Sequence, residues 1–254
     1  MNERPPRMPP RILAIAGSDS SGGAGIQADI KTVTMLGGYA MTAVTAVTAQ
    51  NSLGVTAVEA LSPEMVGAQI DACLSDIGAD AIKIGMLGTP EIARVVAERL
   101  EGLELPIVFD PVMVATSGAS LADEATIAGF ERLMRLAMLT TPNVPELAAL
   151  GGSEAMAARG VAFLAKGGDA EGAIVEDVLV RPGAPDRMWR SERIDTPHTH
   201  GTGCTLSSAI ATLLGKGRSL EQAVDEARQF VRAALLAAPG FGSGHGPMGH
   251  HAVR

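Results

Sequence analysis

Short runs of apolar residues alternate along the chain with longer segments whose apolar residues recur at helical spacing. Residues 12–16 are wholly apolar and end at Gly17, which predicts a buried strand. Residues 26–36 then show a helical pattern that Gly37 and Gly38 bring to an end. By the same criteria we expect strands at residues 40–49, 55–61, 81–85, 106–109, 138–140 and 161–165, an antiparallel hairpin of residues 173–181 and 187–194, and helices at residues 63–77, 90–100, 122–136, 154–159, 204–214 and 220–237.

This alternation predicts the class of fold. Strands separated by helices form βαβ units, and these units build a mostly parallel sheet with helices on both faces. The chain has no linker-like segment and no repeat, so we expect one α/β domain at residues 11–240. A proline-rich leader at residues 1–10 is expected to be disordered, and a tail rich in glycine and histidine at residues 241–254 is expected to be solvated. Ligands bind such sheets at the carboxyl ends of the strands.

The composition narrows the possible partners and the compartment. The 254 residues carry a net charge of −8, whereas a protein that mainly binds nucleic acid is normally basic. The two cysteines, Cys73 and Cys204, cannot form a disulfide framework. No apolar run approaches the length of about 18 residues that a membrane span needs, and no signal peptide is visible. We therefore expect a cytoplasmic protein with no nucleic-acid and no membrane partner.

The strongest local signal is a loop with two glycines that leads into a helix, at residues 199–209. Gly201 and Gly203 permit backbone conformations in which successive amides point into one hollow. The start of the helix adds its positive dipole end, so the loop suits a phosphoryl group in transfer. Cys204 stands at the helix start, where the pKa of a thiol falls, and its thiolate could act as a general base. The alternative is a tight turn with a buried cysteine.

Two acceptor side chains stand where the predicted strand at residues 138–140 leads into a helix. The amide of Asn143 and the carboxylate of Glu146 suit Mg²⁺ with its water shell, and Asp110 adds a carboxylate from another strand end. The same spacing also fits a helix capping box, so both interpretations stay open. Lys166 precedes two glycines and could place a positive charge beside nucleotide phosphates.

Weaker signals come from a second loop and from the histidines. The loop at residues 18–25 is glycine-rich but has neither a Walker lysine nor the dinucleotide-binding glycine spacing, and its small residues would let the backbone approach a flat substrate. His198 and His200 could orient the loop that follows them, although a packing or surface role is favoured. His250 and His251 are expected to be solvated rather than to bind metal.

Seven segments, taken in order, resemble the hydroxymethylpyrimidine and hydroxymethylpyrimidine-phosphate kinases of thiamin biosynthesis. The resemblance extends from about residue 12 to about residue 237. Its motifs occupy residues 16–29, 48–51, 83–87, 110–113, 141–146, 166–168 and 200–204. It implies a three-layer α/β/α fold of the ribokinase-like type, a homodimer, ATP with Mg²⁺, and two successive phosphorylations of an aminopyrimidine.

The resemblance also implies roles for individual residues. Gln50 would contact the pyrimidine, and its pocket would be shaped by Gly17, Asp29, Met86 and Val112. The residues that would bind the nucleotide and the metal are Asn143, Glu146, Lys166 and Asp110. Of these, Glu146 would contact the metal directly or through water. The anion hole would be formed by Gly201, Thr202 and Gly203. Cys204 stands where most ribokinase-like enzymes place an aspartate base.

Two departures and three rival functions bear on this interpretation. Asp169 follows Lys166-Gly167-Gly168 where the family usually has histidine, and the segment at residues 147–165 is short. A pyridoxal-type kinase of the same fold is the nearest rival, and residues 48–51 favour the pyrimidine. A thiol hydrolase with Cys204 as nucleophile would need an oriented His–acid pair. A catalytically silent pyrimidine-binding module would need neither the glycines of the anion loop nor Cys204.

Overall fold

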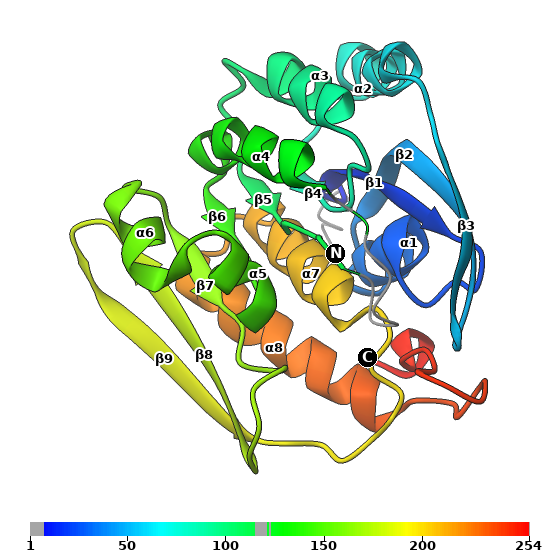
Figure 1. Ribbon diagram of the computed structural model, residues 1–254, viewed down its shortest axis with the longest axis vertical. Helices are drawn as coiled ribbons and strands as arrows, with labels where there is room; N and C mark the ends of the chain where they lie inside the picture. Colours follow the sequence, from blue (N-terminus) through cyan, green and yellow to red (C-terminus); the bar gives the residue numbers. More distant parts are fainter. Residues whose placement is uncertain (1–7, 115–120, 122, 254) are drawn as a thin grey trace, which may run out of the picture.

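The computed structural model describes residues 8–114, 121 and 123–253, and a single twisted sheet forms its centre (Figure 1). In these residues the strands are β1 (Arg11–Asp19), β2 (Tyr39–Asn51), β3 (Gly54–Ala60), β4 (Ala81–Ile84), β5 (Ile107–Phe109), β6 (Leu139–Thr140), β7 (Phe163–Ala165), β8 (Ile174–Arg181) and β9 (Ala184–Glu192). The helices are α1 (Gly25–Met35), α2 (Pro63–Asp76), α3 (Pro90–Leu100), α4 (Glu124–Leu136), α5 (Val144–Ala149), α6 (Gly152–Ala158), α7 (Thr202–Gly215), α8 (Leu220–Leu236) and the short 3₁₀ helix η1 (His250–Ala252).

The strands lie in the order β3-β2-β1-β4-β5-β6-β7-β8-β9. Every pairing from β2 to β7 is parallel, and β3, β8 and β9 add antiparallel edges. The expected mostly parallel α/β sheet is thus confirmed. The hairpin turn is shorter than expected, because Arg181 already pairs with Ala184 and leaves only Pro182 and Gly183 between the strands. Two-residue turns match the twist of the flanking strands best.

Local sequence signals explain where several helices begin. Ser62, Thr89 and Ser219 each accept a hydrogen bond from the backbone amide three residues further on, which satisfies one orphan donor of the first turn. Pro63 and Pro90 occupy the first helical positions, where a missing amide proton costs nothing. These helix starts follow from short-range chemistry alone.

Helices cover both faces of the sheet, so the molecule has three layers (Figure 1). One face is covered by α2, α3 and α4, whose Ile70 and Phe130 are buried against it. The other face is covered by α1, α7 and α8, with Val33, Ile210 and Val224 buried there. Each such side chain contributes about 1.5–3 kcal/mol to stability when it leaves water. Helix α7 is buried along almost its whole length because it lies between the sheet and its neighbouring helices.

The sheet topology places a ligand site beside β1. This strand pairs with both β2 and β4, so the order of the strands reverses at β1. Loops that leave neighbouring parallel strands in opposite directions open a crevice at their carboxyl ends. The loop that follows β1 and the first turn of α7 both reach this crevice, which positions the candidate site.

The segment after α8 contradicts the expectation of a solvated tail. Met248 and His250 are buried, and the Gly249 amide donates to the Ala234 carbonyl of α8 at 2.9 Å. In Figure 1 this red segment turns back from the end of α8 toward α1. Its high glycine content, which suggested a loose tail, instead allows the backbone to approach other elements closely.

The chain start is described only from residue 8, so most of the expected leader lies outside the described residues. Pro10 takes part in the fold, because its carbonyl accepts a hydrogen bond from the Tyr39 amide at 2.8 Å. Across the described ranges of the chain, no helix combines the length and the apolar character that a membrane crossing requires.

Candidate active site

A cleft with a volume of about 510 Å³ lies at the carboxyl ends of the parallel strands. It brings together residues that the sequence predicts for three purposes: substrate recognition, anion binding and nucleotide binding. Those that line it are Gly17, Gln50, Met86, Val112, Gly201, Thr202, Gly203, Cys204, Asp110, Asn143, Glu146 and Lys166. Of the predicted site residues only Asp29 is missing from its walls.

The β1 end of the cleft has a wall of small and polar groups. Gly17 lies against the Met86 side chain, and a Cβ atom at Gly17 would approach the Met86 sulfur to 3.0 Å. Thr45 donates to the Met86 carbonyl at 2.7 Å and so holds the start of that loop. Nearby, Thr48 contacts both Gln50 and the Ser18 carbonyl. The Met86 thioether and the Gln50 amide both line this cleft.

Asp19 organises the glycine-rich loop from inside. Its carboxylate accepts hydrogen bonds from the amides of Ser21, Gly23 and Ala24 at 2.8–3.0 Å. It also lies 2.8 Å from the Nε2 atom of His200, and both side chains are almost completely buried. Burial by itself would raise the pKa of Asp19, but the hydrogen bonds from His200 and the loop outweigh it and lower the pKa to about 2.

His200 is therefore a site residue that sequence reasoning placed in a packing or surface role. Its Nε2 atom also lies 3.4 Å from the Gln50 side-chain nitrogen, so it touches the substrate side of the cleft as well. A signal was available in the sequence, since Asp19 comes shortly after a predicted strand and a buried acidic side chain there needs donors. Which donor it finds depends on a contact across 181 positions. His198, by comparison, is half-buried and makes only local hydrogen bonds.

The anion loop packs directly on the glycine-rich loop. Gly201 is the N-cap of α7 with φ +85°, and a side chain there would collide with the Gly23 carbonyl. Within the described residues, the amides of Gly203 and Cys204 donate to no backbone acceptor, and both residues line the cleft. The Thr202 amide differs, because it donates to the Thr199 carbonyl at 3.2 Å. The predicted anion hole included the Thr202 amide, which is already bonded, and did not include the Cys204 amide, which has no backbone acceptor.

The thiol of Cys204 has a different acidity from that expected. We predicted a lowered pKa at the helix start, but burial raises the pKa of Cys204 to about 11. Lys83 lowers this pKa, whereas the carboxylates of Asp29 and Asp110 raise it further. The prediction of a lowered pKa is wrong because desolvation and two nearby negative charges outweigh the helix dipole. At neutral pH the group is a thiol.

Asp29 lies behind the cleft rather than in its wall, which corrects the predicted contact with substrate. The carboxylate is completely buried and binds the Nζ atom of Lys83 through both oxygens at 2.9 Å. Ser208 of α7 donates to it at 2.6 Å. A carboxylate that is fully enclosed and has three such contacts has no face left for a ligand. It links α1, β4 and α7 beneath Cys204.

The far end of the cleft holds a lysine between carboxylates. The Nζ atom of Lys166 lies 2.8 Å from Asp110 and 3.8 Å from Glu146, and Thr141 donates to Asp110 at 2.8 Å. Burial would raise the pKa of Asp110, but Lys166, Lys83 and Thr141 lower it. Burial raises the pKa of Glu146 to about 7, although Lys166 opposes this. Lys166 supplies the positive charge of this cluster and lines the cleft.

Asn143 and Glu146 satisfy the capping-box interpretation. The Glu146 amide donates to Asn143 at 2.9 Å, and the Asn143 amide donates to Glu146 at 2.8 Å. This pairing leaves part of the Glu146 carboxylate facing the cleft beside Asp110. Two carboxylates fit an Mg²⁺ ion that keeps most of its water and phosphate ligands. Among the described residues no three metal-ligating side chains gather into a cage.

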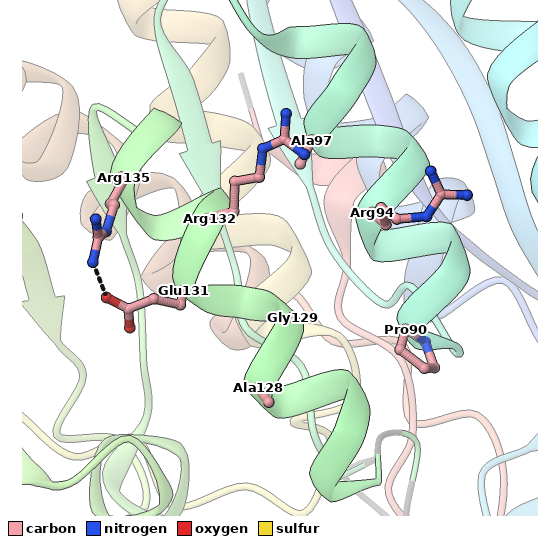
Figure 2. Close-up of a pocket in the computed structure, with 8 residues that line it drawn as sticks. All are labelled: Pro90, Arg94, Ala97, Ala128, Gly129, Glu131, Arg132 and Arg135. Carbon is pink, nitrogen blue, oxygen red and sulfur yellow. Dashed lines mark hydrogen bonds and ion pairs between the residues drawn. The ribbon is translucent and has the colours of Figure 1, made fainter.

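A second hollow, of about 460 Å³, lies between α3 and α4 (Figure 2). Arg94, Arg132 and Arg135 border it, and Arg94 and Arg135 are paired with Glu98 and Glu131 at 2.6 and 3.0 Å. Exposed ion pairs of this kind contribute little energy and leave no free charge for a ligand. None of the predicted site residues lines this hollow, so the cleft at the strand ends is the candidate active site.

Phosphoryl transfer requires positioning and charge stabilisation from a protein, and a cleft that joins amide donors to a buried lysine offers both. With its sheet topology, the chain falls into the class of small-molecule kinases with the ribokinase-like fold. Within this class, residues 19–249 match the family described as phosphomethylpyrimidine kinase. The chain belongs to the phosphomethylpyrimidine kinase family, which confirms the resemblance drawn from the seven motifs.

Individual relatives agree with this assignment. The hydroxymethylpyrimidine/phosphomethylpyrimidine kinase of Streptomyces coelicolor is 44% identical over 260 residues, which cover 97% of this chain and 96% of that protein. A phosphomethylpyrimidine kinase from Clostridium difficile matches with a TM-score of 0.76 and 37% identity, covering 87% of this chain and 97% of that chain. The ADP complex of Bacillus subtilis pyridoxal kinase matches with a TM-score of 0.87 and 34% identity, covering 96% of this chain and 98% of that chain. The similarities identify a kinase.

Proposed function

We propose that the protein transfers the γ-phosphoryl group of ATP to 4-amino-5-hydroxymethyl-2-methylpyrimidine and then to the resulting monophosphate. The product is the diphosphate used in thiamin diphosphate biosynthesis. The observation that carries this proposal is one cleft that Gln50, Gly203, Cys204 and Lys166 line together. An amide-bearing side chain can both donate to and accept from the edge of an aminopyrimidine. The amide of Gln50, the backbone amides of Gly203 and Cys204, and the charge of Lys166 suit the acceptor, the transferred phosphoryl group and the nucleotide, respectively.

The chemical step follows from these assignments of groups to acceptor, phosphoryl group and nucleotide. In the first reaction the hydroxymethyl oxygen forms a bond to the γ-phosphorus while the bond from phosphorus to the β,γ-bridging oxygen breaks, and ADP leaves. In the second reaction a phosphate oxygen of the monophosphate attacks in the same way. The amides of Gly203 and Cys204 stabilise charge on the moving group, and one such donor is worth about 3 kcal/mol of transition-state stabilisation. Cys204 is the candidate group to receive the hydroxyl proton.

Mg²⁺ would be held mainly by nucleotide phosphates and water, with Glu146 and Asp110 as the protein groups nearest to it. The ion supplies charge neutralisation between the phosphates when it is bound. On the protein side, Lys166 pairs closely with Asp110 and lies near Glu146 before the nucleotide binds, and so offsets part of their negative charge. Asn143 orients Glu146 through the capping box. Glu146 lies on α5, Asp110 directly follows β5, and the anion hole lies at the start of α7, so different elements hold the carboxylates and the anion hole.

Pyridoxal is the second candidate acceptor, because a pyridoxal kinase is among the structures that this chain resembles. Pyridoxal also carries a hydroxymethyl group on a flat heterocycle, so the anion hole alone does not discriminate between pyridoxal and the aminopyrimidine. Gln50 favours the aminopyrimidine, since a ring edge with adjacent donor and acceptor atoms satisfies both halves of its amide. The family match and the relative from Streptomyces coelicolor favour the same substrate.

The test is a direct assay of the purified protein with ATP, Mg²⁺ and each acceptor. We expect ADP release with the aminopyrimidine and two products that appear in sequence, the monophosphate before the diphosphate. Chromatography with mass detection separates these products. Turnover of pyridoxal together with no turnover of either pyrimidine would reassign the substrate. Absence of ADP release with all three acceptors would refute the kinase assignment.

We also propose that the protein is a homodimer of the cytoplasm, where ATP is supplied. The hairpin of β2 and β3 carries exposed apolar side chains, because Val47, Leu53 and Val58 are 48%, 70% and 45% exposed. Exposed apolar groups in one region are typical of surfaces that bind another protein chain. Light scattering of the wild type and of a Leu53→Glu variant tests this. A monomeric wild type would refute the proposal.

A further inference from the structure

The C-terminal strap, defined here as residues 244–252, runs from the substrate side of the cleft to the start of α7. At its beginning the Gly244 amide approaches the Ser52 hydroxyl at 3.4 Å, close to the end of β2. Further along, the Gly246 carbonyl accepts a hydrogen bond from the His200 amide at 3.2 Å, and Pro247 forms a bridge with the same residue. The strap therefore lies behind the loop that contains the anion hole.

The strap ends in a buried histidine that contacts the first turn of α7. The Nε2 atom of His250 lies 2.8 Å from the Thr205 hydroxyl, and both side chains are buried. His250 also has a hydrogen bond to the Met248 backbone. Burial lowers its pKa to about 4, so the ring is neutral at physiological pH and carries one donor and one acceptor nitrogen. One ring nitrogen is hydrogen-bonded to the Met248 backbone within the strap, and the other is hydrogen-bonded to Thr205.

Thr205 directly follows Cys204, so its side chain bears on the geometry of the anion hole. A threonine inside a helix commonly turns its hydroxyl back to the carbonyl four residues earlier, which bends the helix. Here that carbonyl belongs to Gly201 and accepts the Thr205 amide at 2.9 Å, while the hydroxyl is bound to His250 instead. The first turn thus keeps the regular hydrogen bond between Thr205 and Gly201, and the two residues between them that line the cleft without a backbone acceptor are Gly203 and Cys204.

We propose that His250 is a positioning residue for phosphoryl transfer, which acts through Thr205 on the amides of the anion hole. This inference rests on the proposed function of the cleft as a kinase site. The anion hole binds the group in transfer more tightly than either substrate. Loss of the His250–Thr205 hydrogen bond should therefore lower kcat and leave the KM values for both substrates nearly unchanged.

The test compares four variants with the wild type. His250→Ala removes the acceptor, His250→Gln restores one, and Thr205→Val removes the hydroxyl with little change of shape. The fourth is the double variant with alanine at 250 and valine at 205. His251→Ala is the matched control, because this neighbouring side chain is exposed. Thermal unfolding of each variant checks that it is folded, and kcat and both KM values are measured with the aminopyrimidine.

We expect His250→Ala and Thr205→Val each to lower kcat about tenfold, with KM changes below about twofold. A tenfold loss equals about 1.4 kcal/mol in the barrier. The double variant should lose no more than either single one, since both remove the same contact. The glutamine variant should recover part of the loss, and His251→Ala should match the wild type.

An unchanged kcat in folded His250→Ala and Thr205→Val enzymes would overturn the proposal. Losses that simply add in the double variant would do so too, as would a change confined to KM. If the alanine variant does not fold, Thr205→Val decides alone, because it leaves the strap intact. The same comparison can be run with pyridoxal as acceptor. A wild type that phosphorylates only pyridoxal would reject the proposed substrate and still yield the kcat comparison for the strap.

Discussion

The Nε2 atom of His200 lies 2.8 Å from a carboxylate oxygen of Asp19, although 181 positions separate the two residues in the chain. This contact joins the glycine-rich loop after β1 to the anion loop before α7. Together with the packing of Gly201 on the Gly23 carbonyl, this buried pair sets the distance between the substrate side of the cleft and the anion hole. A reaction that needs an acceptor oxygen in line with a phosphoryl group depends on such a distance.

Asp19→Asn should weaken both stability and catalysis, because the variant loses the negative charge that His200 and the loop amides hold. The folded pKa of about 2 lies below the ordinary value of 3.8. The carboxylate therefore contributes about 2 kcal/mol above pH 4, and this contribution disappears as the pH falls through 2. Urea unfolding at pH 7 should show this difference between wild type and variant. The gap should shrink toward pH 3, and an equal gap at both values would contradict the pKa.

Cys204→Ala should lower kcat by about 10²–10⁴, the usual range for a lost general base. Because the pKa of the free thiol is about 11, the wild-type rate should keep rising with pH to at least pH 9. A Cys204→Asp enzyme should level off below pH 7, since its carboxylate ionises earlier. Stopped assays across pH 6–10 make the comparison. A wild-type rate that is already flat at pH 7 would mean that the thiol is not the base.

Gln50→Ala should raise the KM for the aminopyrimidine about tenfold or more, since unpaired ring atoms cost about 1–3 kcal/mol on binding. The KM for ATP should stay within twofold, because the Gln50 side chain contacts Thr48 and His200 rather than the charged cluster around Lys166. Gln229→Ala, which removes an exposed amide on α8, is the control. A larger increase in the KM for ATP than in the KM for the pyrimidine would show that Gln50 does not belong to the substrate pocket.

Glu146 should make the nucleotide-free protein less stable as the pH rises. Its folded pKa of about 7 lies above the ordinary 4.5, so the folded state holds a proton that the unfolded state releases. Stability should fall by up to about 3 kcal/mol between pH 4.5 and 7 and then level off. Glu146→Gln should lose this slope, while the exposed Glu154→Gln should retain it. Equal slopes in urea unfolding of all three proteins would refute the raised pKa.

Removing one partner of the Lys83–Asp29 pair should reduce the stability of the fold more than replacing both partners with apolar residues. Lys83→Met or Asp29→Asn alone leaves an uncompensated buried group, which typically costs about 3–5 kcal/mol. The double variant Lys83→Met with Asp29→Leu should regain much of that loss. Denaturant midpoints measure all three. A single Asp29→Asn variant that unfolds like the wild type but loses pyrimidine affinity would return Asp29 to the substrate pocket.

Much of the architecture could be predicted from local patterns. The apolar run at residues 12–16, the helix after Pro63 and the glycine loop before α7 all lie where their spacing indicated. Such signals act within a few residues, so they survive without knowledge of the fold. Strand ends in a parallel sheet also meet at one edge, which explains why Gln50, Lys166 and Cys204 could be assigned to one cleft.

The sequence by itself thus determined the parallel sheet, the edge that carries the site and most side chains of the cleft, because these depend on periodicity and on neighbours along the chain. Only the tertiary structure decided that His200 meets Asp19, that His250 is buried against Thr205, and that the Cys204 thiol is a weak acid. Each of these depends on which distant groups surround a side chain and on how much water the fold removes. Desolvation and contacts between distant residues leave no periodic trace in a sequence.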